Sequence, residues 1–311
     1  MKRTKIVLAL TASVAMLSVA ACGSSSNGNP LSTNTAASGG GSSASGSIVV
    51  GSANFPENQL LAEIYAGALE AKGVKVSKKL NIGSREVYIP ALKDGSIDLI
   101  PEYTGVLTQY FNKNASATDA DGVYKELQAA LPSTLTVLAK STAEDKDAVV
   151  VTKETANKYH LKSIADLQPH AKDLTLGGPP EWKTRPTGVP GLKKLYNLDF
   201  KSFRALDTGG PLTVQALKNG QVDAADLFTT DPSIAANGFV ILDDPKHLFA
   251  AQNVVPLVTK AKVTDTISSA LNAVSAKLDT ATLGELVKEV VVDKKDAAVV
   301  AKEFLSKNNL G

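Results

Sequence analysis

The feature that most constrains the fold is an internal repeat of eight residues. Residues 91–98 (ALKDGSID) recur as residues 216–223 (ALKNGQVD), with matching residue classes in the same order. Each copy is typical of a helix end, a left-handed glycine cap and the start of a strand. Tyr103 and Phe228 follow the two copies at the same offset, and each is followed by threonine. Helix–glycine–strand units are common, so chance likeness is the alternative, but the shared aromatic offset favours two similar lobes.

Short apolar runs alternate with helical patterns from Ser47 onward, which predicts an α/β protein. Residues 48–50 and 74–80 predict strands, and residues 57–72 predict a helix because their apolar positions recur at helical spacing. Three further helical patterns end the chain, over residues 265–278, 281–292 and 296–307. Ligands bind beyond the carboxyl ends of strands in open α/β sheets, so we expect the two repeat aromatics to face each other across a cleft.

Two candidate crossover strands set the expected lobe boundaries. Residues 148–151 lead into the middle segment, and residues 253–258 lead out of it. We therefore predict one lobe from residues 47–147 plus 256–311, and a second lobe from residues 148–255. Two parallel crossovers make a hinge, so the expected mechanism is closure of the lobes around a ligand.

The N-terminal segment has the layout of a secretory signal. Basic residues precede an apolar stretch over residues 6–21, which is short for a membrane span of ~20 apolar residues. The stretch ends at Val19-Ala20-Ala21-Cys22, which resembles a bacterial lipobox and implies that Cys22 is lipidated after removal of residues 1–21. Residues 22–46 are rich in glycine and serine, which predicts a flexible tether. We expect a lipid-anchored protein on the extracytoplasmic face of a bacterial membrane.

Several functional classes lack support in the sequence. The formal net charge is +2 and the basic residues are scattered, which argues against a nucleic-acid partner. Cys22 is the only cysteine, so a disulfide or a multi-cysteine metal site within the chain is impossible. The three histidines are isolated, and no zinc-protease, hydrolase-elbow or phosphate-loop motif occurs. Glu102 has no evident partner carboxylate for acid catalysis. We expect neither an enzyme nor a bound metal or cofactor.

Five blocks of sequence resemble the substrate-binding proteins of osmoprotectant importers, the glycine betaine, choline and carnitine receptors of the ProX and OpuC type. In order, the blocks are residues 51–57 (GSANFPE), 91–98, 101–105 (PEYTG), Arg185 with 190–192 (PGL), and 228–231 (FTTD). The resemblance covers almost the whole mature chain and implies the two-lobed type II periplasmic-binding-protein fold. It also implies a small-molecule ligand and, as partners, ABC permease subunits with a cytoplasmic ATPase; we expect a monomer.

The resemblance also implies where the ligand binds. The family holds a quaternary ammonium among tyrosines, because such a cation donates no hydrogen bonds and is stabilised by aromatic faces. Tyr103 matches one cage tyrosine, and Phe228 keeps the ring of another without its hydroxyl. Asp147 and Gln252 stand in the blocks that normally supply the other rings. In their place we expect Asp147 to pair with a cation, and Gln252 to bond a hydroxyl or carbonyl group.

The remaining candidates come from the same blocks. Ala53 replaces the lysine that pairs with a ligand carboxylate in the family, so the resemblance leaves Arg185 for that role. Asn54 and Phe55 precede a helix whose free N–H groups favour anionic or carbonyl atoms. The candidate set is completed by the threonine after each ring, Thr104 and Thr229. A strand-end ring, a loop charge or an ordinary helix cap is the structural alternative for these residues.

The lost tyrosines leave the ligand open at this point. One interpretation is an osmoprotectant such as glycine betaine or a related compound. The alternatives are a changed ligand class, such as a polyol, an amino acid derivative or a phenolic compound, and a ligand sensor that uses the same cleft without import.

Overall fold

The structure is a computed structural model that describes residues 47–311. The predicted signal, Cys22 and the predicted tether lie outside the described residues. Within the described range, no helix combines the length and apolarity needed to cross a membrane.

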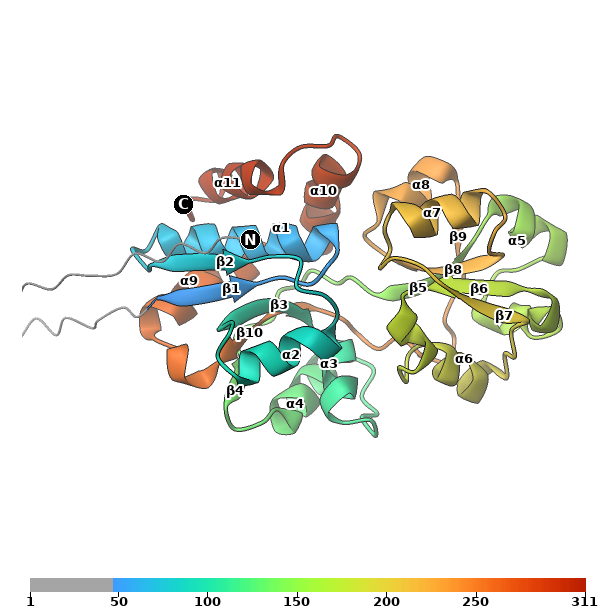
Figure 1. Cartoon of the computed structure of the whole chain (residues 1–311), viewed down its shortest axis with the longest axis horizontal. Helices are drawn as coiled ribbons and strands as arrows, with labels where there is room; N and C mark the ends of the chain where they lie inside the picture. The colour runs from blue at the N-terminus through green and yellow to red at the C-terminus, as the bar shows by residue number, and fades with distance from the viewer. Residues whose placement is uncertain (1–46) are drawn as a thin grey trace, which may run out of the picture. The chain divides into compact units, whose positions relative to one another are not determined.

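Two five-stranded mixed sheets form the centres of two lobes (Figure 1). The first sheet has the order β2-β1-β3-β10-β4 and consists of β1 (Ile48–Gly51), β2 (Val76–Lys79), β3 (Leu99–Tyr103), β4 (Leu135–Val137) and β10 (Val254–Thr259). The second has the order β7-β6-β8-β5-β9 and consists of β5 (Asp147–Val151), β6 (Thr175–Gly178), β7 (Ser202–Ala205), β8 (Ala224–Phe228) and β9 (Val240–Ile241).

The two sheets share one topology, which confirms the predicted similarity of the lobes. Read in the orders above, each sheet has two parallel pairings followed by two antiparallel ones. The repeat also matches in detail. Gly95 and Gly220 both have positive φ, at 79° and 65°, where glycine is favoured. Asp98 and Asp223 each accept a hydrogen bond from the backbone N–H of Val49 and Thr175, respectively, on the neighbouring strand.

Helices cover both faces of the first sheet. One face packs against α1 (Pro56–Glu70), α9 (Asp265–Ser275), α10 (Thr280–Val291) and α11 (Ala297–Lys307), around a core that includes Leu60 and Ile64. The other face packs against α2 (Arg85–Lys93), α3 (Thr104–Phe111) and α4 (Ala120–Ala130). The predicted first helix and the three predicted C-terminal helices therefore form, each ending within a few residues of its predicted bounds.

The second sheet is covered in the same way. One face packs against α5 (Lys153–Tyr159), α6 (Val189–Tyr196) and three short 3₁₀ segments, η1 (Ile164–Leu167), η2 (Ala171–Asp173) and η3 (Pro180–Lys183). The other face packs against α7 (Pro211–Lys218) and α8 (Pro232–Asn237). A fourth 3₁₀ segment, η4 (Lys260–Lys262), follows β10 in the first lobe.

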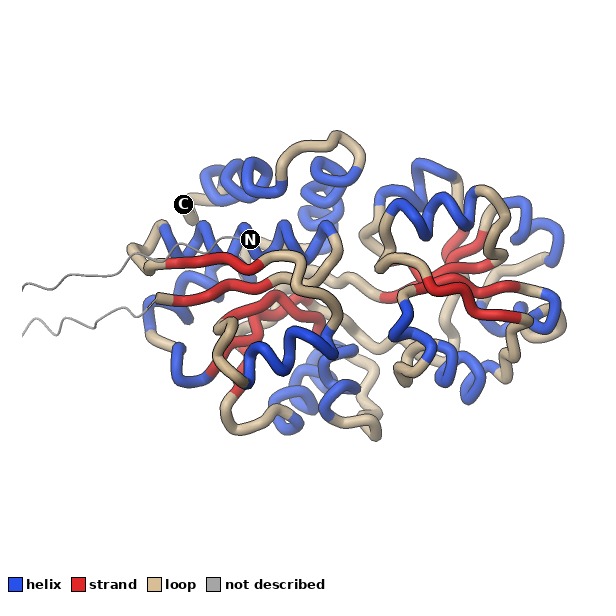
Figure 2. The backbone as a smooth tube through the Cα atoms, viewed as in Figure 1, coloured by secondary structure: helices blue, strands red, loops and turns tan. Residues whose placement is uncertain are grey.

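Two chain segments cross between the lobes (Figure 2). The chain passes from β4 to β5, and returns from β9 to β10. The crossovers were expected to be parallel, but Glu144 and Asn253 pair in an antiparallel bridge because the chain leaves on one segment and returns on the other. The strands do not begin at the predicted lobe boundaries of residues 148 and 256. Asp147 already belongs to β5 of the second sheet, and β10 of the first sheet begins at Val254.

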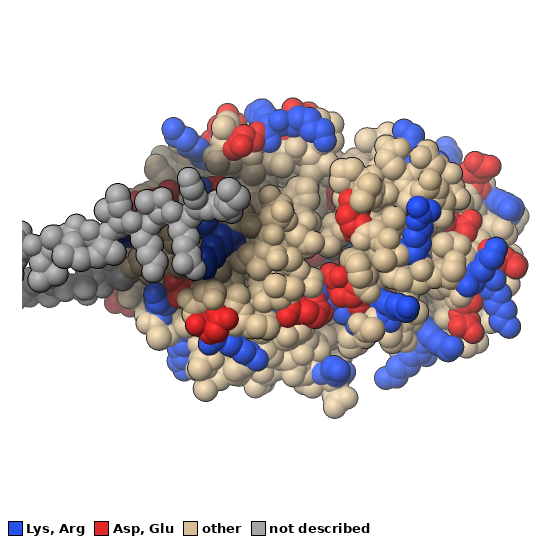
Figure 3. Space-filling model, in the orientation of Figure 1, with Lys and Arg blue, Asp and Glu red and all other residues tan. Residues whose placement is uncertain are grey.

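Charged side chains of both signs are interspersed over the face of the molecule in Figure 3. Several of them form ion pairs near the surface, including Lys78 with Glu63 at 2.7 Å and Lys295 with Glu289 at 2.6 Å. This distribution agrees with the small net charge of +2.

Candidate functional site

Three aromatic rings from both lobes lie together at the carboxyl ends of strands. Tyr103 ends β3, Phe228 ends β8, and Phe55 precedes Pro56 at the start of α1. The Phe55 ring centroid lies 6.1 Å from that of Tyr103 and 5.2 Å from that of Phe228. The two repeat aromatics therefore face the same space, with the ring of Phe55 in contact with both.

A cavity between the lobes is lined by these rings and by polar residues. Its volume is about 50 Å³. Seven predicted residues line it: Asn54, Phe55, Tyr103, Asp147, Arg185, Phe228 and Gln252. The sequence did not single out several other lining residues, including Tyr88, Asp145, Glu181, Thr208 and Asp226.

The cavity is too small for an organic solute to enter as it stands. A space of this size holds only a few water molecules. A solute of the size of an osmoprotectant therefore needs more room than this cavity provides.

One wall of the cavity is acidic. Asp147 pairs with Phe228 across the β5–β8 ladder, and Asp226 precedes Phe228 by two residues. All three side chains therefore lie on one face of the second sheet. Burial and neighbouring carboxylates raise the pKa of Asp226 well above its usual value. Between residues 47 and 311, no lysine or arginine forms an ion pair with Asp147 or Asp226.

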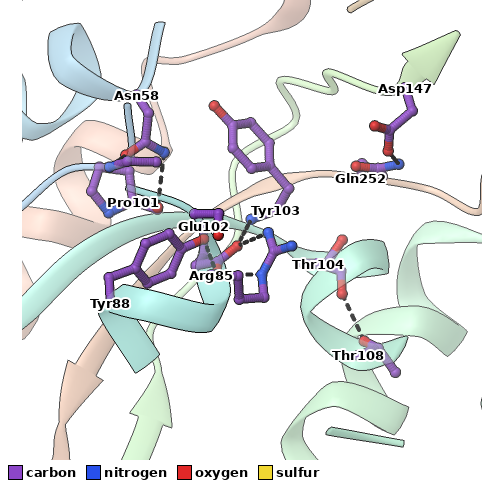
Figure 4. A network of polar contacts seen from close by, with 12 residues as sticks. Asn58, Arg85, Tyr88, Pro101, Glu102, Tyr103, Thr104, Thr108, Asp147 and Gln252 are labelled. Carbon is purple, nitrogen blue, oxygen red and sulfur yellow. Dashed lines mark hydrogen bonds and ion pairs between the residues drawn. The ribbon is translucent and has the colours of Figure 1, made fainter. Parts of the chain in front are cut away.

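Asp147 and Gln252, both predicted to contact a ligand, contact each other. The Gln252 Nε2 donates a hydrogen bond to the Asp147 Oδ2 at 3.0 Å, and both side chains are buried (Figure 4). Gln252 belongs to the returning crossover, and Asp147 begins β5. This bond therefore joins the two crossovers at the cavity wall.

Arg185 lies in a cross-lobe ion pair. Its Nη2 and Nε contact the two carboxylate oxygens of Glu86 at 2.8 and 3.1 Å, and Glu181 lies 3.7 Å away. Although partial burial opposes the shift, the hydrogen bonds and charge of Arg185 lower the pKa of Glu86 to about 2. The resemblance implied that Arg185 clamps a ligand carboxylate, but here its bidentate partner is a carboxylate of the other lobe.

Arg85 and Glu102 form a buried ion pair close to Tyr103 (Figure 4). Both Glu102 oxygens accept hydrogen bonds from Arg85 at 2.7 Å, and Glu102 also accepts from the Tyr88 hydroxyl and the Tyr103 backbone N–H. Burial alone would lower the pKa of Arg85, but the carboxylate of Glu102 raises it. With four donors on a fully buried carboxylate, Glu102 has a structural role and Arg85 is not free to bind a ligand.

A second polar contact between the lobes involves Glu57. Its carboxylate accepts hydrogen bonds from the Tyr103 hydroxyl at 2.7 Å and from the Thr230 hydroxyl of the second lobe at 2.6 Å. Burial raises the pKa of Glu57, and burial together with Glu57 raises that of Asp145. The hydroxyl of Tyr103 is thus directed at Glu57, which leaves the ring of Tyr103 as its contribution to the cavity.

Thr104 and Thr229 do not line the cavity; they hold the crossovers. The Thr104 hydroxyl accepts from the Asn253 N–H at 3.0 Å and donates to the Ala251 carbonyl at 3.2 Å. In the second lobe, the Thr229 hydroxyl accepts from the Lys146 N–H at 2.9 Å. Each threonine of the repeat therefore fastens the crossover that enters its own sheet.

The missed residue with the clearest sequence signal is Asp226. It is the only charged residue of β8, which otherwise reads Ala-Ala-Leu-Phe, and it shares a strand face with Phe228. An acid at an apolar strand position is unusual unless it is paired or functional. Asp145 and Glu181 have no such signal, because both lie in irregular, polar segments.

A second cavity lies on the other side of Phe55 and Phe228. Its volume is about 360 Å³, and its lining includes Val214 of α7, Ala236 of α8, and Val287, Val290 and Val291 of α10. The lining also includes polar residues such as Glu57 and Asp231. The smaller cavity is the candidate site for a polar solute, because only its lining combines Tyr103 with Asp147 and Asp226.

The comparisons with known proteins assign the family. Residues 46–307 match the family described as the substrate binding domain of ABC-type glycine betaine transport systems. The chain belongs to this family. It is therefore the extracytoplasmic substrate-binding protein of a bacterial ABC importer of the osmoprotectant type; it is not an enzyme, and it binds a small solute and works with permease components.

Individual relatives agree with the family. The glycine betaine-binding protein YehZ of Escherichia coli is 28% identical over 276 residues, covering 84% of this chain and 90% of that protein. The carnitine transport binding protein OpuCC of Listeria monocytogenes is 27% identical over 282 residues, covering 85% of this chain and 87% of that protein. The ergothioneine transport permease/binding protein EgtU of Helicobacter pylori is 26% identical over 266 residues; the match covers 85% of this chain but spans only about half (48%) of that protein.

A solved structure confirms the fold. The crystal structure described as a glycine betaine/carnitine/choline ABC transporter is 28% identical, covers 85% of this chain and 99% of the solved one, and superposes with a TM-score of 0.66. This OpuAC-family chain therefore has the two-lobed periplasmic-binding-protein fold that the resemblance implied.

Proposed function

We propose that this OpuAC-family protein captures a quaternary-ammonium osmoprotectant in the cavity between Phe55, Tyr103 and Phe228. The single observation that carries the proposal is the meeting of three rings from two lobes with a buried acidic wall in one cavity. A quaternary ammonium is attracted to aromatic faces, by ~0.5–2 kcal/mol per ring, and to the nearby carboxylates. The candidate ligands are those named for the relatives: glycine betaine, choline and carnitine.

The proposed mechanism is hinge closure. Ligand contacts from both lobes stabilise the arrangement in which Phe228 reaches Phe55, and Arg185 reaches Glu86. The permease then recognises that arrangement, and a cytoplasmic ATPase supplies the energy for transport. We further propose that the protein is a monomer, attached to the membrane through lipid on Cys22 and a tether over residues 22–46.

Calorimetric titration of the purified protein with glycine betaine, choline and carnitine tests the proposal. We expect at least one to bind, and Phe228→Leu to weaken that binding at least tenfold, equivalent to about 1.4 kcal/mol. Leucine keeps an apolar side chain but removes the ring. The matched control is Phe203→Leu, which removes a half-buried ring of the same lobe outside the cavity. If none of the three solutes binds, or if Phe228→Leu binds like the wild type, the proposal is wrong.

A further inference from the structure

Asp226 is a buried carboxyl group without a hydrogen-bond partner among residues 47–311. Its side chain lines the cavity, the residue is only 1% exposed, and its Oδ1 is enclosed but accepts no hydrogen bond from the described residues. Buried polar atoms in native proteins are nearly always paired, and the exceptions often mark a functional site. The group can therefore accept a hydrogen bond from a donor that the described part of the chain does not supply.

The charged groups around Asp226 do not supply that donor. Asp147, Asp145 and Glu181 are all acidic, and each raises the pKa of Asp226 through its charge. Arg185 lowers that pKa, but its guanidinium is committed to Glu86, with Glu181 also nearby.

The same arrangement is unfavourable for a ligand carboxylate. Arg85, the other guanidinium on the cavity, is held by both oxygens of Glu102. The acidic residues of the wall would repel a negative group, and within residues 47–311 both guanidinium groups that line the cavity already have carboxylate partners.

A trimethylammonium group alone does not complete this site. Its nitrogen carries no hydrogen, so it is stabilised by rings and charge but cannot donate to the Asp226 oxygen. A ligand that satisfies both the rings and the acidic wall therefore needs a hydrogen-bond donor in addition to its cationic centre.

We propose that Asp226, together with Asp147, forms a subsite for an N–H or O–H donor on a cationic ligand that carries no carboxylate. The inference rests on the proposed function and narrows its ligand class. Asp147 contributes because it lies on the same sheet face, and its only hydrogen-bond donor among the described side chains is the Gln252 amide.

A structural role for Asp226 is the competing account. The Nε1 of Trp182 is also buried and has no hydrogen-bond partner in the described part of the chain. A β-carbon at Gly178 would lie 3.3 Å from both Asp226 and Trp182, so the two side chains are neighbours. A water molecule between them would give Asp226 a role in folding rather than in recognition.

Three probes of equal length separate these accounts. Choline, (2-aminoethyl)trimethylammonium and propyltrimethylammonium share the trimethylammonium group and end in a hydroxyl, an ammonium and a methyl group, respectively. By calorimetric titration of the wild type, we expect at least one donor probe to bind at least tenfold more tightly than propyltrimethylammonium. The tighter of the two donor probes identifies the donor as O–H or N–H. Glycine betaine, which ends in a carboxylate, should bind at least tenfold more weakly than choline.

The variant Asp226→Asn tests the residue itself. We expect it to weaken the binding of the favoured donor probe at least fivefold more than it weakens the binding of propyltrimethylammonium. The matched control is Asp173→Asn, an exposed acid of the same lobe outside the cavity, which should leave all affinities unchanged. Thermal unfolding of the ligand-free variant verifies that it folds.

Two results would overturn the inference while the proposed function stands. In one, the three probes bind the wild type equally well and compete for one site. In the other, Asp226→Asn weakens all three equally, as a structural role predicts. If none of the probes and none of the family osmoprotectants binds, the proposed function fails and the subsite fails with it.

Discussion

Asp226 shows how one residue can affect stability and recognition in opposite ways. In the ligand-free protein its carboxyl group is buried against Asp147, Asp145 and Glu181, with only Arg185 offsetting them, so its pKa is raised well above 3.8. A raised carboxyl pKa means that the folded state favours the protonated form. The resulting stability is fully present below about pH 4 and is lost as the pH rises through the raised pKa.

We therefore predict a pH-dependent gain of stability for Asp226→Asn. At about pH 8 the ligand-free variant should be more stable than the wild type, by about 1–3 kcal/mol, because the amide cannot ionise. Near pH 4, where the wild-type carboxyl is protonated, the difference should disappear. Urea unfolding at both pH values measures it, with Asp173→Asn as the control; a difference that is the same at both pH values contradicts the assignment.

The sequence predicted the rings better than the charges. Tyr103 and Phe228 were identifiable because each lies at the same offset from a repeated helix end. The partner of Arg185 could not be identified from the sequence, because Glu86 lies 99 residues away and contacts Arg185 only through the packing of the lobes. Thr104 and Thr229 were grouped with the ligand residues by proximity in sequence, whereas their hydroxyls point at the crossovers.

The repeat unit is the element that organises the fold. In each lobe a helix ends at a glycine with positive φ, a buried strand follows, and the threonine after that strand binds a crossover. The strands of this unit were predictable because they are apolar and bounded by clear turn signals. The antiparallel course of the crossovers was not, because it depends on how the returning segment at Asn253 meets Glu144.

We predict that Thr104→Val weakens the hinge without touching the cavity. Valine has a similar shape but leaves the buried Asn253 N–H without its acceptor, which should cost about 1–3 kcal/mol of unfolding free energy. Binding should weaken by a similar factor for all ligands, because the change acts on the lobes and not on ligand contacts.

The control for this prediction is Thr108→Val. Thr108 is also buried in α3, but its hydroxyl donates to the Thr104 and Val123 carbonyls and not to the crossover. Urea unfolding and calorimetry compare the two variants. Ligand-selective loss of binding in Thr104→Val would place Thr104 in the ligand site instead.

At the scale of the whole molecule, the contacts between the lobes fall into two kinds. The Arg185–Glu86 and Thr230–Glu57 contacts join the lobes directly through polar groups. The rings of Phe55 and Phe228 meet around a cavity that is too small for a solute. The proposed hinge closure accounts for capture in these terms: a movement opens the cavity, and a bound ligand stabilises its closure.

The most direct test of this account is a crystal structure of the protein with the quaternary amine that binds most tightly. We predict that the ammonium lies within about 6 Å of the Tyr103 and Phe228 ring centroids, with both lobes in contact with the ligand. A ligand found in the cavity between α8 and α10, or bound to one lobe only, would contradict it.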